Sequence, residues 1–91
     1  MIRLKHLLES ADELIPWVES HFEDIVTGYD AWLSEHLESM VDAGTITSAQ
    51  AFDRMQLFGR CSDDAAEFVD YVQRVLRKSP SETRAFLSRF M

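Results

Sequence analysis

The chain has 91 residues, a formal net charge of −7, 46% hydrophobic residues and a single cysteine. This composition is typical of one globular domain over residues 1–91, and it excludes a disordered tail and a disulfide-stapled secreted scaffold. No apolar run reaches the length of a signal peptide or a membrane span, so we expect a cytoplasmic protein that does not bind a membrane.

The N-terminal third predicts one or two amphipathic helices. Apolar residues recur at the spacing of one helical face from Leu4 to Ile15. Pro16 then either starts a second helix or kinks the first, because proline lacks the amide N–H of an interior helical residue. The apolar face continues from Trp17 to Val26, and both alternatives remain open.

The next helix is expected to start at Thr27 and Gly28 and to stop at Gly44. Trp32 lies beside its apolar stripe, among acidic neighbours. Large aromatic residues are more often part of a core, but this position makes Trp32 a candidate aromatic anchor for a partner. The stripe itself consists of Tyr29, Leu33, Leu37, Met40 and Val41.

A short helix is predicted after Thr47. The segment from Thr47 to Gln50 has the pattern of a capping box, in which the side chains of the first and fourth residues bind each other's backbone amides. We expect Gly59 to end this helix. Its inner face would carry Ala51, Phe52, Met55 and Phe58.

The clearest predicted helix runs from Ser62 to Lys78, with Ser62 as its cap. Ser79 to Glu82 forms a second capping-box pattern with a proline at the first helical position, and it predicts a final helix that buries Phe86, Leu87 and Phe90. The fold class is therefore all-α: a compact antiparallel bundle of five to six short helices with short connections. The buried stripe from Ser62 to Lys78 would consist of Ala65, Phe68, Val69, Val72, Val75 and Leu76.

One stretch resembles a known family. Gly44, Ile46, Thr47 and Gln50 fill the places of a helix-ending glycine, an apolar residue, a cap and a capping-box partner, and this arrangement is similar to the caspase-recruitment type of the death fold. The resemblance covers about residues 29–90. It implies a non-catalytic adaptor that binds its own kind or a similar domain, in cell-death, immune or antiphage defence signalling. Such domains commonly join an acidic patch on one molecule to a basic patch on another. The resemblance implies that Asp42 belongs to the acidic patch.

The two halves of the chain differ in charge. Residues 6–53 carry eleven acidic side chains and no Lys or Arg, whereas residues 54–91 carry seven basic and five acidic side chains. Most charges on amphipathic helices only solvate the outer face, but segregated charges fix orientation and speed association. The predicted interface residues are Glu19, Glu23, Asp24, Asp30, Glu35, Glu38 and Asp42 on the acidic side, and Arg60, Arg74, Arg77 and Lys78 on the basic side.

The sequence does not indicate an enzyme. Cys61 precedes a helix and follows an arginine, which can lower a thiol pKa, but no base is placed beside it in the sequence. No pair of residues has the spacing of a metal site, and no glycine-rich phosphate loop is present. We therefore expect no catalytic residue, no cofactor and no metal.

Two functions from different classes remain open. The first is a protein–protein interaction module that assembles with itself or a similar helical domain, as a homo-oligomer or with a protein partner. The second is a small acidic inhibitor that mimics nucleic acid and blocks a basic groove on its partner. Neither binds nucleic acid, because an acidic surface repels it.

Overall fold

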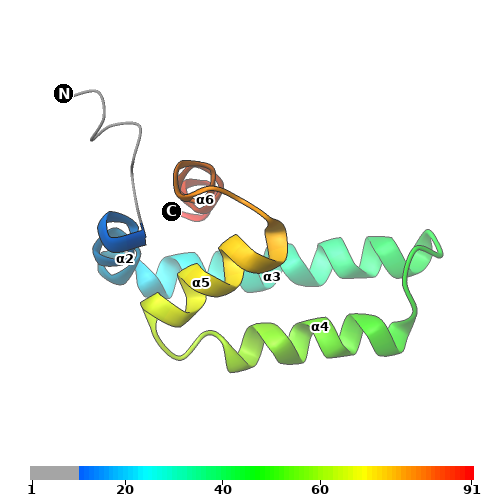
Figure 1. Ribbon diagram of the computed structural model, residues 1–91. Coiled ribbons are helices and arrows are strands. Elements are labelled where there is room, and N and C mark those ends of the chain that lie inside the picture. The colour runs from blue at the N-terminus through cyan, green and yellow to red at the C-terminus, as the bar shows by residue number, and fades with distance from the viewer. Residues whose placement is uncertain (1–10) are drawn as a thin grey trace.

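The computed structural model describes residues 11–91, and this part of the chain contains five α-helices, one 3₁₀ turn and no strand. The all-α bundle is therefore confirmed, while the apolar positions expected between residues 4 and 8 lie outside the described residues. The elements are α2 (Ala11–Ser20), α3 (Phe22–Asp42), α4 (Ser48–Arg60), α5 (Ala65–Leu76), α6 (Pro80–Leu87) and η1 (Ser88–Phe90) (Figure 1).

The first break in the described chain falls at His21 and not at Pro16. Pro16 lies inside α2, and the Ser20 hydroxyl donates to the Pro16 carbonyl at 3.1 Å. The chain turns at His21, whose amide donates to the Val18 carbonyl, and α3 starts at the next residue. Acidic residues in its first turn favour this start, because they face the positive end of the helix dipole.

The predicted start at Thr27 and Gly28 is wrong, because α3 continues through both residues. Gly28 has a different role. A Cβ added at Gly28 would lie 2.5 Å from the Cβ of Phe90, closer than two such atoms can pack. The glycine therefore allows the C-terminal turn η1 to pack directly on the backbone of α3.

The turn between α3 and α4 follows its sequence signals. Gly44 has a positive φ of 77°, a left-handed conformation that glycine adopts without strain. The Thr47 hydroxyl accepts from the Gln50 amide at 3.1 Å, and the Gln50 side chain accepts from the Thr47 amide at 2.9 Å. The capping box at the start of α4 is therefore confirmed.

The predicted boundary between α4 and α5 needs two corrections. Gly59 does not end α4, which continues to Arg60. Ser62 does not cap α5, because its hydroxyl donates to the Gly59 carbonyl instead. The cap is Asp64, whose carboxylate accepts from the Glu67 amide at 2.8 Å and forms the stronger, charge-assisted bond.

The start of α6 agrees with the sequence. Ser79 and Glu82 form a reciprocal capping box, and Pro80 takes the first helical position. Before it, α5 ends at Leu76 because Arg77 adopts a left-handed conformation with φ of 54°. Lys78 therefore lies outside the helix that was predicted to contain it.

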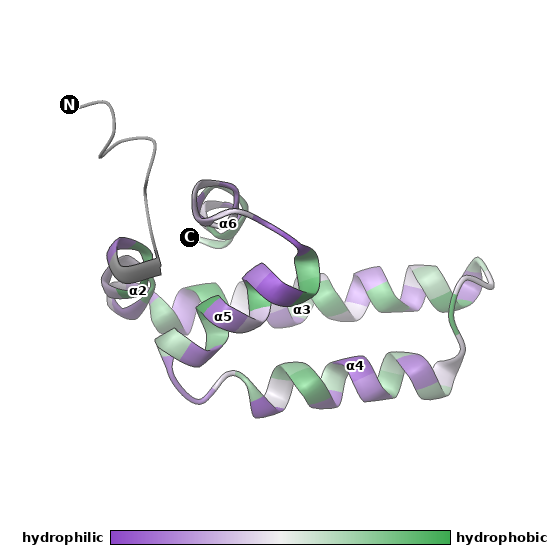
Figure 2. Ribbon diagram, viewed as in Figure 1, coloured by the Kyte–Doolittle hydropathy of each residue, from purple (hydrophilic) through white to green (hydrophobic). Residues whose placement is uncertain are grey.

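An aromatic cluster forms the core. Tyr29 of α3 lies at its centre, fully buried, and shares a hydrogen bond of 2.8 Å with the hydroxyl of buried Tyr71 on α5. Hydrophobic and hydrophilic residues alternate along each helix, as amphipathic helices require (Figure 2). Rings with centroids 5.0–6.2 Å from that of Tyr29 come from Trp32, Phe58, Phe68, Tyr71, Phe86 and Phe90.

Two predicted burials are wrong, and one burial was not predicted. Phe52 is 62% exposed and Val75 is 45% exposed, whereas both were expected on inner faces. Val75 lies on the exposed side of the last turn of α5, whereas the next residue, Leu76, packs against the core. Tyr71, absent from the predicted stripe, is buried because α5 crosses α3 at Tyr29.

The bundle is elongated, with principal extents of 48 × 23 × 19 Å. Figure 1 shows α2, α5 and α6 gathered around one end of α3, while the other end of α3 is accompanied by α4. The second half of α3 and the first half of α4 thus form a two-helix arm that projects from the bundle.

Candidate interaction surfaces

The acidic residues predicted as an interface all lie on exposed positions. Glu19 is on α2, and the other six are on α3. A helix turns about 100° per residue, so Asp24, Glu35 and Asp42 share one side of α3 with Glu38 close to it. Glu23 and Asp30 form a second row, about a quarter-turn away. We call this two-row surface the acidic face of α3; it consists of Glu23, Asp24, Asp30, Glu35, Glu38 and Asp42.

None of the acidic-face carboxylates forms an ion pair with another residue between 11 and 91. Within the described residues, these charges are therefore not neutralised by ion pairs. Like charges three or four residues apart, such as Glu35 and Glu38 or Glu38 and Asp42, repel each other by a few tenths of a kcal/mol per pair. A complementary basic surface would relieve this repulsion.

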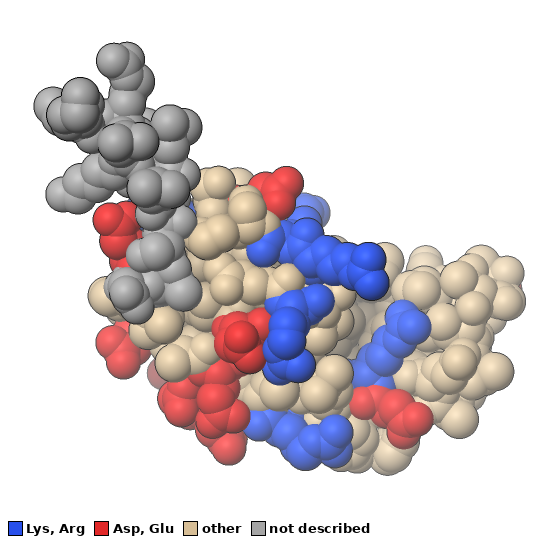
Figure 3. Space-filling model, in the orientation of Figure 1, with Lys and Arg blue, Asp and Glu red and all other residues tan. Residues whose placement is uncertain are grey.

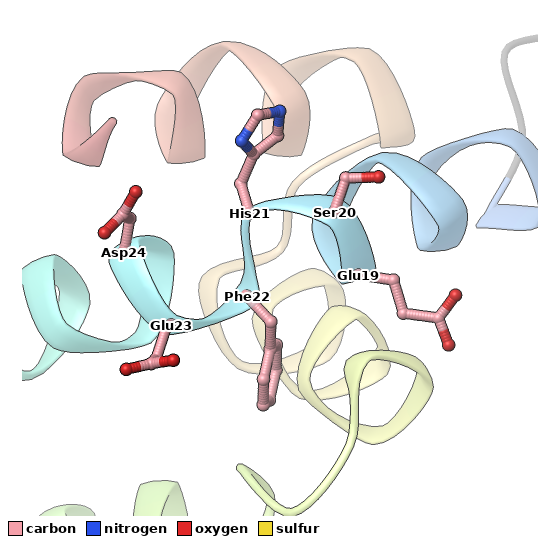
Figure 4. A pocket seen from close by; sticks show the side chains of 6 residues that line it. All are labelled: Glu19, Ser20, His21, Phe22, Glu23 and Asp24. Carbon is pink, nitrogen blue, oxygen red and sulfur yellow. The ribbon is translucent and has the colours of Figure 1, made fainter.

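The turn between α2 and α3 contains a hollow with three carboxylates and His21, but it is not a metal site. Figure 4 shows that the side chains of Glu19, Glu23 and Asp24 point in different directions, with His21 and Phe22 on opposite sides of the backbone. No group of three or more His, Cys, Asp or Glu side chains within residues 11–91 is arranged to hold a metal ion.

The predicted basic residues come from three places: Arg60 ends α4, Arg74 lies on α5, and Arg77 and Lys78 lie in the link to α6. Figure 3 shows Lys and Arg side chains in an interrupted band across the visible face, over α5 and α4, with acidic side chains beside them. We call Arg60, Arg74, Arg77 and Lys78 the basic patch.

The basic patch is partly engaged within the molecule. The guanidinium Nε of Arg74 lies 3.2 Å from the Asp70 carboxylate, in an exposed pair that contributes about 0–1 kcal/mol. The Lys78 ammonium lies 5.0 Å from the centre of the Phe86 ring. Arg77 carries its charge on the left-handed residue after α5, where it extends from a sharp turn.

Trp32, the candidate anchor, is half buried. Its ring contacts Phe86 at a centroid distance of 5.1 Å and stacks on His36 at 4.9 Å with an interplanar angle of 9°. A shallow hollow of about 260 Å³ borders Trp32, Glu35, His36 and Ser39. One side of the indole therefore belongs to the core and another to the surface near the acidic face.

One surface feature was not predicted from the sequence. A groove of about 410 Å³ runs between α3 and α4 in the projecting arm, and exposed Phe52 forms part of its wall. The helical spacing of Phe52 predicted burial. Periodicity alone does not show whether a third helix covers α3 and α4, so this exposure could not be predicted. The lining residues are Ser34, Leu37, Glu38, Val41, Ser48, Ala51, Phe52 and Met55.

Comparisons with family models, with curated proteins and with solved structures give no significant match. Among the described helices, none combines the length and the apolar character needed to cross a lipid bilayer.

Proposed function

We propose that the protein is a non-catalytic interaction module that assembles with itself or with a similar helical domain. The acidic face of α3 on one molecule contacts the basic patch on the next. The observation that carries the proposal is the separation of charge. Residues 11–53, which include α2 and α3, contain no Lys or Arg, whereas every Lys and Arg of the described chain lies in α4 or after it.

This contact joins two different surfaces, so it propagates. A heterologous contact closes into a ring or continues as a filament. Opposed charges raise the rate of encounter and fix the orientation of the partners, and salt screens both effects over a Debye length of about 8–10 Å. The assembly is therefore expected to weaken as ionic strength rises.

The resemblance to the death fold belongs to the same proposal. The features that suggested it, the turn at Gly44 and the capping box from Thr47 to Gln50, are both formed. On this reading the module is a cytoplasmic adaptor in immune, cell-death or antiphage defence signalling, and the single cysteine is consistent with a reducing compartment. Asp42, two residues before Gly44, would contribute to its acidic patch.

A triple charge reversal tests the proposal. Arg74→Glu, Arg77→Glu and Lys78→Glu together should abolish salt-sensitive association, measured by sedimentation velocity at low ionic strength. The matched partner is Asp24→Lys, Glu35→Lys and Asp42→Lys on the acidic face. Mixing the two reversed proteins should restore mixed assemblies, because each then presents the charge that the other needs. Unchanged association of the first triple variant would overturn the proposal.

The alternative function, an acidic inhibitor that mimics nucleic acid, is favoured by one observation. The acidic face of α3 is exposed and unpaired within residues 11–91, and it needs no basic patch to act. Such an inhibitor would occupy a basic groove that normally binds nucleic acid. The basic-patch reversal should leave its binding intact, whereas reversal of the acidic face should remove it.

A further inference from the structure

One flank of α4, from the edge of the α3–α4 groove round to solvent, carries no charge. α4 packs mainly against α3, and Phe58 is its only buried residue. On this flank, at the edge of the groove, Phe52 is 62% exposed because no element within residues 11–91 covers it. We call this surface the outer face of α4; it consists of Ser48, Ala49, Phe52, Met55, Gln56 and Gly59.

Nothing within residues 11–91 packs against Gly59 on this face in a way that requires a glycine. Glycine destabilises a helix interior relative to alanine, so it persists where a turn or a close approach requires it. Gly44 adopts the left-handed conformation of a turn, and the missing side chain of Gly28 lets Phe90 pack against α3. A Cβ at Gly59 would meet nothing within 4 Å, and its φ is not positive. The missing side chain leaves space for a group from another molecule.

The charges beside the outer face have a two-fold pattern. Asp53 and Arg60 lie along the same edge of this face, about two helical turns or about 10 Å apart. When two such helices pack antiparallel about a two-fold axis, the same edges meet with their direction reversed. Asp53 then faces Arg60 of the partner subunit, and the reciprocal pair forms at the other end.

The same two-fold axis places Phe52 against glycine. Phe52 and Gly59 lie seven residues apart on the outer face, so an axis midway between them brings each Phe52 ring over Gly59 of the partner subunit. Met55 lies near the axis, and the apolar groove of the arm opens beside it. One copy thus supplies the ring and the space that the other copy needs.

We propose that the outer face of α4 is a homodimer interface, in which the α4 helices of two copies pack antiparallel around a two-fold axis. The occupant is a second copy because the ring, the glycine and the two charges complement themselves under this single operation. The uncharged face also lets two copies of net charge −7 approach without bringing their acidic faces together.

This contact is separate from the one under the proposed function. It is closed, because the same surface is used on both copies. It leaves the acidic face open, and of the basic patch it engages Arg60 but not Arg74, Arg77 or Lys78. The buried groups are mostly apolar, so the dimer should persist at about 1 M salt, where the Debye length is about 3 Å. High salt therefore distinguishes the two contacts.

The first test is Phe52→Asp, with the molar mass measured by sedimentation equilibrium at about 1 M salt. The wild-type chain should be a dimer, and the variant should dissociate with at least a thirtyfold higher dissociation constant, the effect typical of a central aromatic anchor. The matched control is Val75→Asp, which places the same charge at an exposed apolar residue outside α4 and should leave the dimer unchanged.

A second pair of variants separates the interface from helix stability. Gly59→Leu should raise the melting temperature of the dilute monomer, since leucine favours helix and the space is open, yet it should weaken the dimer. Asp53→Arg should weaken it as well, and the double change with Arg60→Asp should restore it. A monomeric wild-type chain in high salt would overturn this proposal. So would Phe52→Asp and Gly59→Leu variants that both dimerise with the dissociation constant of the wild-type chain. Neither result would affect the charge-driven proposal.

Discussion

The two ends of α3 differ in what surrounds them. At its N-terminal end, side chains from α2, α5, α6 and η1 enclose α3, and Tyr29 contacts six other aromatic rings. In the projecting arm, α3 is accompanied by α4, which buries only Phe58 and leaves Phe52 in solvent. Stability is therefore concentrated at the aromatic end, whereas the arm offers uncommitted surface.

The largest contrast should come from one chemical change made in both regions. Phe68→Ala removes a fully buried ring and should destabilise the fold by about 3–5 kcal/mol. Phe52→Ala should change the free energy of unfolding by less than about 0.5 kcal/mol, because that ring is exposed. Urea denaturation of dilute protein measures both values. Similar losses in the free energy of unfolding for the two variants would contradict the contrast, because they would mean that Phe52 contributes to the core as Phe68 does.

The buried tyrosine pair gives the next largest effect. Tyr71→Phe leaves the Tyr29 hydroxyl buried without a partner and should cost about 1–3 kcal/mol. The double variant with Tyr29→Phe should recover part of this loss, since neither hydroxyl then needs a partner. A double-mutant cycle by urea denaturation measures the coupling, and strict additivity of the two changes would contradict the hydrogen bond.

The same pair predicts alkaline sensitivity. Burial, followed by the hydrogen bond to Tyr71, raises the pKa of the Tyr29 hydroxyl well above its ordinary value of 10.0. Burial also raises the pKa of Tyr71, against an opposing effect of the hydrogen bond. The unfolded chain therefore ionises first, and stability should fall as pH rises above about 10. The double phenylalanine variant should show a smaller fall in melting temperature over this range.

Replacing each of two helical glycines by alanine should change the stability of the fold in opposite directions. Gly28→Ala should destabilise the fold by about 1–3 kcal/mol, because the new Cβ displaces Phe90 from α3. Gly59→Ala should stabilise the monomer by about 0.5–1 kcal/mol, because nothing surrounds that position. Melting temperatures of dilute samples measure both effects. The same sign for both would show that the packing of η1 on α3 is not what requires Gly28.

The smallest effect concerns the cap of α6. The backbone and side-chain hydrogen bonds to Ser79 hold the pKa of the Glu82 carboxyl below its ordinary value of 4.5. The carboxylate is thus better stabilised in the folded chain, and this contribution is present above that pH and lost as pH falls below it. Glu82→Gln keeps the capping geometry without the charge. Its melting temperature should depend less on pH in this range than that of the wild-type chain.

Local signals explain which parts of the fold could be predicted. The caps at Thr47 and Ser79 and the turn at Gly44 each depend on a few adjacent residues, and all three formed as expected. Where several candidates stand together, as from Ser62 to Asp64, the sequence does not decide which one caps. The charged cap at Asp64 formed instead of the hydroxyl cap.

The remaining differences depend on contacts between distant segments. Gly28 resembles a helix start until Phe90 is known to pack against it. Phe52 fits an amphipathic stripe, but within residues 11–91 no third helix covers that side of α4. The charged residues proposed for an interface were identifiable as exposed, because exposure of charges is the rule. The outer face of α4 was not, because it becomes visible only once the position of α4 at the edge of the bundle is known.

The central claim is that this domain acts by association. The most direct test is the molar mass of the wild-type chain by light scattering, across concentration, at near-physiological salt and at about 1 M salt. We predict a mass that rises with concentration at the lower salt and falls to that of a dimer at the higher salt. A mass of 10.5 kDa under every condition, that of one chain, would contradict both self-association contacts.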